Sequence, residues 1–591
     1  MAIIIAEGKQ SYTNDAGVPL AGGQLYTYDA GTTTPRLTWS DSAQTAPHTN
    51  PIILDARGEA TVFWNGAYKV ELRTAAGVVI WTVDNVTTDS TGGSADTLRA
   101  DLALNSGSSL IGFIQNGTGA VARTAQAKMR EAVTVDDFGA VQDGATNDTG
   151  AIGAAIAALG NGGGLLQVPV GYSLVTDLNL DGTCLELTQP SAFRGIGFAS
   201  CGVKPSASVS SSTDTLRFSP SAAFDCTGSE ISGLYFGDHT VGTRAGRNGI
   251  RLLTDTAGQF LSRLSITRNF IAPGTGPGIY HLNDPGLNVT GGFFTSVISD
   301  NNVGGGIKLE NSGDSISILR NTMTGPFIGV DMAIIAGASM TEVIGNNITC
   351  AGGTLRVDSG VRFKFWNNNT ENFTAGAAVQ NNSASVNLTG SSGTIISGEI
   401  CGNLFSVYGT STATRVINVA GARGTLIANN VFVSGIGTCT TAIVVDATAT
   451  DTRIGPNAYN VGITTKVTDN GVGTMGVVKN LTLLNGWLDF AGGTVLPGCI
   501  KSPGDGIVHL WGKIKSGTLA DGTIIATLAV GFRPSGTIEA PMMANNAGVR
   551  TMGAITVEST GDVKVYGAQT TACSFNLTFP AANLADAVSY E

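Results

Sequence analysis

A large apolar residue followed three positions later by asparagine recurs eight times between residues 266 and 457. Successive asparagines are separated by 20 to 35 residues, and short runs of strand-forming residues surround each of them. An irregular repeat of this length, built around a turn residue, predicts a solenoid in which each repeat forms one coil. The eight pairs are Ile266/Asn269, Ile298/Asn301, Ile318/Asn321, Ile344/Asn347, Phe365/Asn368, Ile400/Asn403, Ile427/Asn430 and Ile454/Asn457.

The repeated asparagines are expected at tight corners of the coils. Asparagine tolerates the left-handed backbone conformation and can bond its own backbone. Stacked from coil to coil, the side-chain amides are expected to form a ladder. The pattern therefore predicts a purely structural role for these residues.

A second recurring string is a strand of alternating residues that ends in an acid. If Ile307 and Leu309 point inward, Lys308 and Glu310 point outward, because side chains alternate along a strand. Coils stack about 4.8 Å apart, so these acids are predicted to form an outer column, with about 5 Å between neighbours and about 10 Å between alternate members. The copies are Ile307–Glu310, Ile328–Asp331, Leu355–Asp358 and Ile443–Asp446.

This column is the candidate site for chemistry. Glycoside hydrolysis uses two carboxyl groups, about 5–5.5 Å apart when configuration is retained and about 6.5–9.5 Å apart when it is inverted. Crowded carboxylates also raise one pKa, as a general acid requires. The candidate catalytic residues are Glu310, Asp331 and Asp358, and the candidate substrate-binding residues are Tyr280, His281, Lys308, Arg356 and Trp366.

Several alternatives to the column remain open. The reaction could be carried by a cleft between subunits or by other carboxylates, namely Asp238, Asp255, Asp284, Asp314 and Glu399. The column can also be interpreted as a solvated row of acids that has no catalytic role, with Lys308 and Arg356 as cross-strand partners. A lyase route would use Tyr280 or His281 as the base and Arg251 as the neutralising cation, although the chain has only four histidines.

Composition limits the class of protein. The 591 residues are too many for one core, so several domains are expected. With 42% hydrophobic residues, 13% charged residues and 81 glycines, the chain is typical of β-rich structure with frequent turns. The net charge of −11 and the lack of a basic run argue against nucleic acid as a partner. No apolar run approaches a membrane helix, so no membrane insertion is expected.

Neither a metal site nor a cofactor is predicted. The eight cysteines are spread singly, without metal-ligand spacing, and are expected to be reduced and mostly buried. The first residues carry no signal-peptide pattern, which predicts synthesis in a cytoplasm.

Residues 1–88 read as a compact β domain and carry the first resemblance. The strings GVPLAGGQLYTYDAGTTTPRLTW (17–39), NPIILDARGEATVFW (50–64) and VVIWTVDNV (78–86) resemble the N-terminal domain of bacteriophage tailspikes and tail fibres. The resemblance implies a domain that anchors the protein to the virion through tail or portal-proximal proteins. Residues 89–131 are predicted to form a linker and a neck. Helices are expected over Thr97–Leu104 and Val121–Val133, and both are too short to be stable alone.

The second resemblance begins at residue 117. The segment 117–159, with DFGA (137–140), resembles the start of the pectate-lyase-like parallel β-helix of phage tailspikes. Asp137, Asp143 and Asp148 are expected to serve capping and turn roles, with a short helix over about 150–159 closing the end of the solenoid. Residues 132–480 are then a right-handed parallel β-helix. Residues 481–591 resemble the β domain at the tip of phage fibres, which implies trimerisation or sugar binding.

Together the resemblances imply an all-β homotrimer: an N-terminal virion-anchoring β domain, a short helical neck, a right-handed parallel β-helix and a β-sandwich-like tip. Such a spike is exposed on the virion tail and recognises and depolymerises a bacterial surface polysaccharide during adsorption, by endo-glycosidase rather than lyase action. The alternative is a non-enzymatic receptor-binding tail fibre or a structural virion protein, so whether the chain is an enzyme stays open.

Overall fold

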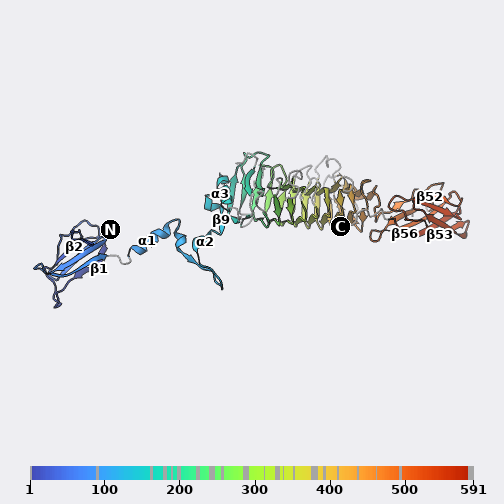
Figure 1. The fold of residues 1–591 in the computed structure, drawn as a ribbon. Helices are drawn as coiled ribbons and strands as arrows, with labels where there is room; N and C mark the ends of the chain where they lie inside the picture. The colour runs from blue at the N-terminus through green and yellow to red at the C-terminus, as the bar shows by residue number, and fades with distance from the viewer. Residues whose placement is uncertain are drawn as a thin grey trace. The chain divides into compact units, whose positions relative to one another are not determined.

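The computed structural model divides the chain into two compact units, Met1–Glu131 and Ala132–Glu591 (Figure 1). The structure describes residues 3–87, 92–159, 164–176, 183–187, 191–195, 201–220, 226–237, 246–254, 259–283, 292–311, 313–325, 333–336, 339–350, 353–373, 384–390, 394–408, 412–435, 438–460, 462–490 and 496–582.

The first unit begins with a small β domain. One sheet has the antiparallel order β3-β2-β5-β6, and β1 pairs with β4. Alternate residues of β4 and β5 are buried, as the period of two in the sequence predicts, and they form a core that includes Val62, Tyr68 and Val70. The strands are β1 (Ile3–Ser11), β2 (Gln24–Asp29), β3 (Ile52–Ile53), β4 (Glu59–Trp64), β5 (Ala67–Arg73) and β6 (Val79–Thr87).

The rest of the first unit holds short helices and a two-stranded sheet. The helix expected over Val121–Val133 is confined to α2 (Ala125–Met129), where the Thr124 side chain caps the first turn by accepting a hydrogen bond from the Ala127 N–H. The other elements are α1 (Gly92–Ala103), the 3-10 helix η1 (Gly107–Leu110), β7 (Gly112–Phe113) and β8 (Arg123–Thr124).

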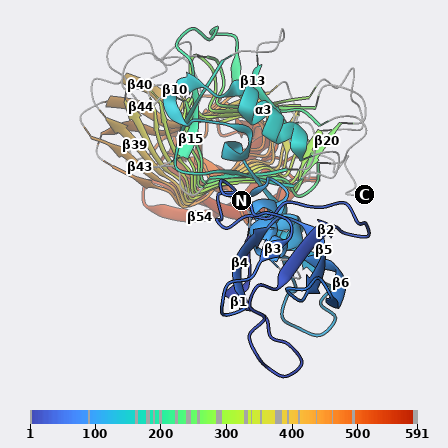
Figure 2. The same cartoon turned by 90° about the vertical axis from the view of Figure 1, so that its left-hand side faces the viewer.

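The second unit contains a parallel β-helix, the fold class that the sequence predicts. Three parallel sheets run along it, with 12, 12 and 13 strands, and each coil after the first contributes one strand to the main path of each sheet. We name them the first, second and third sheet in the order in which the chain enters them. Figure 2 looks toward the end of the stack and shows the strands lying behind one another.

The first sheet contains β9 (Ala132–Thr134), β11 (Gly164–Val168), β14 (Ser191–Gly195), β17 (Glu230–Ser232), β21 (Ser265–Thr267), β25 (Val297–Ser299), β28 (Ser317–Leu319), β31 (Glu342–Ile344), β34 (Lys364–Trp366), β38 (Glu399–Cys401), β42 (Leu426–Ala428) and β45 (Arg453–Ile454). The second sheet contains β10 (Asp143–Asn147), β12 (Gly171–Val175), β15 (Cys201–Pro205), β18 (Tyr235–Gly237), β22 (Phe270–Ala272), β26 (Asn302–Gly304), β29 (Thr322–Gly325), β32 (Asn347–Cys350), β35 (Asn369–Phe373), β39 (Leu404–Tyr408), β43 (Val431–Ser434) and β46 (Ala458–Tyr459).

The third sheet contains β13 (Thr183–Leu187), β16 (Asp214–Phe218), β19 (Ile250–Leu253), β23 (Ile279–Leu282), β27 (Ile307–Glu310), β30 (Ala333–Ala336), β33 (Leu355–Val361), β36 (Val386–Thr389), β40 (Thr412–Ala420), β44 (Thr438–Val445) and β47 (Ile463–Asp469). Its side branches are β37 (Ile395–Ile396) and β41 (Ala422–Arg423), and β20 (Phe260–Ser262) pairs separately with β24 (Gly292–Phe294).

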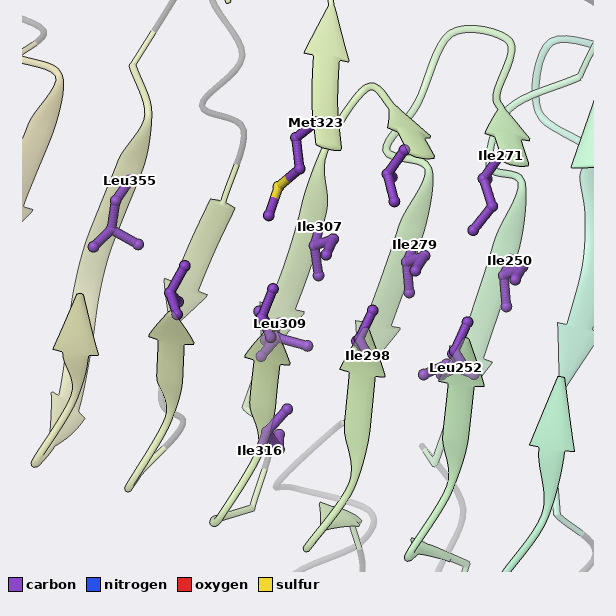
Figure 3. Packing of buried hydrophobic residues seen from close by; sticks show 14 of the residues in the cluster. Ile250, Leu252, Ile271, Ile279, Ile298, Ile307, Leu309, Ile316, Met323 and Leu355 are labelled. Atoms are coloured by element: carbon purple, nitrogen blue, oxygen red, sulfur yellow. The ribbon is translucent and has the colours of Figure 1, made fainter. Parts of the chain in front are cut away.

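Inward-facing side chains of the three sheets form one continuous core. Ile250, Ile279 and Ile307 occupy the same position in successive strands and lie side by side inside the solenoid (Figure 3). Each is at most 1% exposed. The apolar members of the alternating pattern are therefore stacked in files, which is why the repeat can be read from the sequence.

The predicted asparagine ladder is present between the first and second sheets, with one member corrected. The side chain of Asn301 donates from Nδ2 to the Ile266 carbonyl one coil earlier (2.8 Å) and to Asn321 Oδ1 one coil later (2.9 Å). The fourth member is Asn346, not Asn347, because Asn346 is 1% exposed and bonds in the ladder, whereas Asn347 is an exposed residue of β32. The ladder members are Asn269, Asn301, Asn321, Asn346, Asn368, Asn403, Asn430 and Asn457.

The start of the solenoid confirms the expected capping and turn roles of three aspartates. Asp137 forms a capping box with Thr134 around the 3-10 helix η2 (Val135–Phe138). Asp143 accepts backbone N–H bonds within its own turn, and the carboxylate of Asp148 accepts the N–H groups of residues 141 and 142. Helix α3 (Thr149–Ala158) follows at this end of the stack (Figure 1).

The C-terminal part of the second unit has a separate core, which includes Trp487, Phe532 and Phe579. Its strands belong to one antiparallel sheet, where a sandwich would have two. They are β48 (Lys479–Asn480), β49 (Leu488–Asp489), β50 (Gly498–Lys501), β51 (Ile507–Lys515), β52 (Thr523–Thr527), β53 (Ile538–Asn546), β54 (Val549–Val557), β55 (Asp562–Tyr566) and β56 (Ala572–Pro580).

The described cysteines are reduced and mostly buried, as the sequence predicts. Seven described cysteines are free thiols, and six of them are buried. Of the helices in the described part of the chain, none combines the length and apolarity that a membrane-spanning helix needs.

Candidate functional site

The candidate site lies on the outer face of the third sheet. Strand register brings one outward side chain from each successive strand into a single file, which we call the outer file. From β16 to β36 its members, in order along the stack, are Arg217, Arg251, Tyr280, Lys308, Ile334, Arg356 and Asn387, and the register places Glu186 of β13 before them and Asn418 of β40 after them. Three predicted substrate-binding residues, Tyr280, Lys308 and Arg356, are therefore brought together as alternation along the strand requires.

Tyr280 lies between two cations in this file. The Arg251 guanidinium carbon lies 3.9 Å from the centre of the Tyr280 ring, and Lys308 Nζ lies 4.9 Å from it on the next strand. The tyrosine is 7% exposed, and its hydroxyl donates a hydrogen bond to Glu310 Oε2. Burial, together with that bond to a carboxylate, raises the pKa of Tyr280 to about 12, so the phenol stays protonated at neutral pH.

Glu310 ends β27 and points outward beside the outer file, as predicted. Its Oε1 lies 2.5 Å from Lys308 Nζ, and the carboxylate side chain keeps 27% of its surface exposed. Burial raises the pKa of Glu310, but the hydrogen bonds from Lys308 and Tyr280 outweigh it and leave the pKa below its ordinary value. Glu310 is therefore ionised at neutral pH, which suits a base or a nucleophile and not a general acid.

Asp358 lies on β33, at an irregularity in the pairing of β33 with β30. Its Oδ2 accepts hydrogen bonds from Arg356 Nε at 3.1 Å and Nη2 at 2.9 Å, and its Oδ1 accepts one from the Thr389 hydroxyl. The side chain is 34% exposed. Asp358 thus faces outward on the same sheet as Glu310 and is held by two partners.

The register of the intervening strand corrects the predicted acidic column. The strand that pairs with both β27 and β33 is β30, and the residue opposite Glu310 is Ala336. The prediction that Ile328–Asp331 supplies this strand is wrong, because Ala333–Ala336 takes that place. Asp331 itself lies outside the described residues. Glu310 and Asp358 are two strands apart, which corresponds to about 10 Å along the stack.

His281 does not line the outer face. It follows the outward Tyr280 in β23, so alternation turns it into the core, where it is fully buried. Its Nε2 lies 3.0 Å from the Thr254 hydroxyl, and its ring packs on Phe293 with 5.1 Å between ring centres. Burial, reinforced by the charge of Arg251, lowers the pKa of His281 to about 3. The prediction that it contacts substrate on this face is therefore wrong.

Trp366 lies on a different sheet. It ends β34 of the first sheet, pairs with Ile344 and has Lys364 Nζ 5.0 Å from its ring. Eight residues separate it from Asp358, enough for the chain to turn the corner from the third sheet to the first. It therefore does not belong to the outer file.

These positions disfavour the lyase alternative. Arg251 is in place as a cation, but both candidate bases are unsuited to it. Tyr280 has a pKa of about 12 and therefore stays protonated at neutral pH. His281 is fully buried in the core and does not reach the outer face. A lyase needs a group that removes a proton from the sugar, and neither of the two candidate bases serves.

Two residues beside the site escaped the sequence interpretation. Arg217 belongs to the outer file because the string Leu216-Arg217-Phe218 alternates like Ile250-Arg251-Leu252, a signal that was available in the sequence. Asp214, 9% exposed, accepts a 2.6 Å hydrogen bond from Asn248 Nδ2, and burial raises the pKa of its carboxyl group.

No group of three or more histidine, cysteine, aspartate or glutamate side chains in the described ranges is arranged to hold a metal ion. The carboxylates of Glu310 and Asp358 are paired with Lys308 and Arg356.

The chain that carries this site folds as a parallel β-helix. No protein-family model matches the chain, and no curated protein matches it in sequence. Solved structures that resemble it are mostly phage tailspikes. The Dettilon tailspike protein is 14% identical, with a TM-score of 0.45, over 78% of this chain and 96% of that one.

Two further tailspikes are similar at the same level. A variant of the tailspike protein of E. coli bacteriophage HK620, in complex with a pentasaccharide, is 12% identical with a TM-score of 0.40, over 81% of this chain and 99% of that one. Bacteriophage CBA120 tailspike protein 3 is 14% identical with a TM-score of 0.35, over 82% and 94%. Likeness at these values concerns the fold and carries no argument about activity.

Proposed function

We propose that this protein is a phage tailspike that binds a bacterial surface polysaccharide along the third sheet and hydrolyses it. The observation that carries the proposal is the placing of two carboxylates, Glu310 and Asp358, on one outer face beside Tyr280, Lys308 and Arg356. Hydrolysis of a glycosidic bond needs a pair of carboxyl groups on either side of the bond. The outer file places Tyr280 before that pair and Asn387 after it, as one aromatic and one polar partner for the sugar chain.

The spacing favours inversion of configuration. Glu310 and Asp358 lie two strands apart, with β30 between them, which corresponds to about 10 Å along the stack. Retaining enzymes hold their carboxyl groups about 5–5.5 Å apart. Glu310, with its lowered pKa, is assigned as the base that activates water. Asp358 is left as the acid that protonates the leaving oxygen, a role that requires its ion pair with Arg356 to open when the sugar binds. Proton NMR of the first product tests this step, and retention of configuration at the anomeric carbon would contradict it.

A homotrimer is part of the proposal. Eight large apolar residues between positions 97 and 131 are 42–76% exposed in the single chain, a density that is unusual on the surface of a monomer. Packing of three copies along this neck would bury them. They are Leu98, Leu102, Leu104, Leu110, Ile111, Ile114, Val121 and Met129. Sedimentation equilibrium of the full-length protein is expected to give three times the 60.2 kDa chain mass.

Virion attachment through residues 1–88 is proposed from the resemblance of that segment to tailspike anchoring domains. Deletion of these residues is expected to abolish incorporation into particles and to leave polysaccharide binding unchanged. Incorporation of the truncated chain at the wild-type level would contradict the assignment.

A second function, recognition without cleavage, is favoured by one observation. Glu310 and Asp358 are each ion-paired with the basic residue two positions earlier in the same strand, as expected of a sheet face with a purely structural role. Incubation of the purified protein with a panel of bacterial surface polysaccharides distinguishes the two functions. New reducing ends without an unsaturated-uronate absorbance support hydrolysis, whereas binding without product supports a receptor-binding spike. An unsaturated-uronate absorbance would contradict hydrolysis and revive the lyase.

A further inference from the structure

The outer file is unusually basic for this chain. Of the six members from Arg217 to Arg356, four are cations (Arg217, Arg251, Lys308 and Arg356), although the protein has a net charge of −11. The charges are not balanced evenly. Lys308 and Arg356 each pair with an acid of their own strand, whereas the corresponding residue after Arg251 is Leu253. Arg251 therefore lacks the acid in its own strand that Lys308 and Arg356 each have.

Arg251 is a buried cation whose donors have no hydrogen-bond partner among the described residues. It is 9% exposed, and its Nε is buried without a hydrogen-bond partner. In the described part of the chain its guanidinium forms no hydrogen bond and no ion pair, and its one side-chain contact of note is the ring of Tyr280, 3.9 Å away. Asp214 is close enough to feel its charge but does not pair with it.

Leaving a buried charge unpaired is costly, and arginine offers five donors in a planar fork that matches a carboxylate. The stack on Tyr280 fixes the plane of the guanidinium, and Arg247, in the same neighbourhood, adds positive potential. A ligand carboxylate would supply the missing acceptor. Tyr280 also contacts Lys308 and Glu310 on the next strand, so Arg251 lies next to the proposed cleavage site.

We infer that Arg251 is an anion-binding subsite and that the polysaccharide recognised by this face is acidic, with a uronic acid carboxylate on Arg251. This inference rests on the proposed function and adds the class of substrate to it. The carboxylate fixes the register of the sugar chain along the outer file, so that one glycosidic bond lies between Glu310 and Asp358.

The test compares two hexasaccharides that differ only in charge. One is hexagalacturonate, and the other is the same hexamer after reduction of its carboxyl groups to alcohols. Titration calorimetry with the full-length protein is expected to show at least about tenfold tighter binding of the acidic hexamer, with an affinity that falls as salt rises. Arg251→Gln is expected to remove the preference, and Arg251→Lys to keep part of it, because lysine retains the charge and loses the fork.

Arg320→Gln is the matched control. Arg320 follows the first-sheet strand β28, binds Asp300 with two nitrogens at 2.7–2.8 Å and does not belong to the outer file, so its loss is expected to leave the preference unchanged. Equal affinity for the two hexamers, binding of neither, or a full preference in Arg251→Gln overturns the inference. Cleavage of a neutral bacterial polysaccharide in the same preparation would leave the proposed function standing, which separates the two failures.

Discussion

The substitution Asn346→Ala tests the packing of the solenoid at one point of the asparagine ladder. The side chain of Asn346 takes part in four hydrogen bonds. Its Nδ2 donates to the Ile318 carbonyl and to Asn368 Oδ1, each at 3.0 Å. Its Oδ1 accepts from the backbone N–H of Asn321 at 2.8 Å and from Asn321 Nδ2 at 3.1 Å.

All four bonds are lost in the alanine variant, and the backbone groups left behind are buried away from water. At about 1 kcal/mol net for each bond, the free energy of unfolding is expected to fall by about 4 kcal/mol. The neighbouring Asn347→Ala is the control, because Asn347 is exposed and accepts one hydrogen bond, from Asn369 Nδ2 at 3.2 Å. Its expected cost is below about 0.5 kcal/mol.

Urea unfolding of the full-length protein, followed by circular dichroism at one protein concentration, measures both variants. The fixed concentration matters because association of the chains shifts apparent stability. Equal destabilisation by the two substitutions, or a larger effect of Asn347→Ala, would refute the ladder assignment and the coil geometry that depends on it.

Three further outcomes are expected. Tyr280→Phe removes a donor that lowers the pKa of Glu310, so the acidic limb of the kcat/KM profile is expected to move to higher pH, and an unchanged limb would contradict the base assignment. His281 has a folded pKa of about 3 against an ordinary 6.5, so the unfolded chain binds more protons between these values, and stability falls by up to about 1.4 kcal/mol per pH unit as pH drops through that window. His281→Asn is expected to reduce this slope in urea unfolding at several pH values, and an identical slope would place the acid sensitivity elsewhere. Trp366→Ala is expected to change polysaccharide affinity by less than about twofold, because the residue lies on the first sheet, and a loss above about tenfold would return it to the binding face.

Much of the fold could be predicted because stacking forces a periodic pattern on the chain. The apolar residue and the asparagine three positions later occupy fixed places in every coil, so the ladder is visible as a repeat. The one error, Asn347 for Asn346, arose where two asparagines are adjacent. Ile344 precedes Asn347 by the same three positions that separate the buried Val343 from Asn346. Spacing alone cannot choose between these two pairs.

The candidate site was predicted less well, for reasons that differ between residues. Alternation along a strand already turns His281 inward once Tyr280 points outward, so that error lay in the interpretation. Asp331 belongs to a string that alternates like a strand, but the strand that pairs with β27 is Ala333–Ala336. Which of two neighbouring strings joins the sheet depends on the length of the turn that precedes it. The bond from Tyr280 to Glu310, and the lowered pKa that follows, depends on side chains from adjacent coils 30 residues apart.

The central claim is that the outer face of the third sheet carries the chemistry, and matched substitutions of two glutamates test it most directly. Glu342 of the first sheet is 34% exposed and pairs with Lys364 at 2.8 Å, much as Glu310 pairs with Lys308. The release of reducing ends from a cleaved polysaccharide is expected to fall at least about 100-fold in Glu310→Gln and to stay within about twofold of wild type in Glu342→Gln. Wild-type release by Glu310→Gln would contradict the claim.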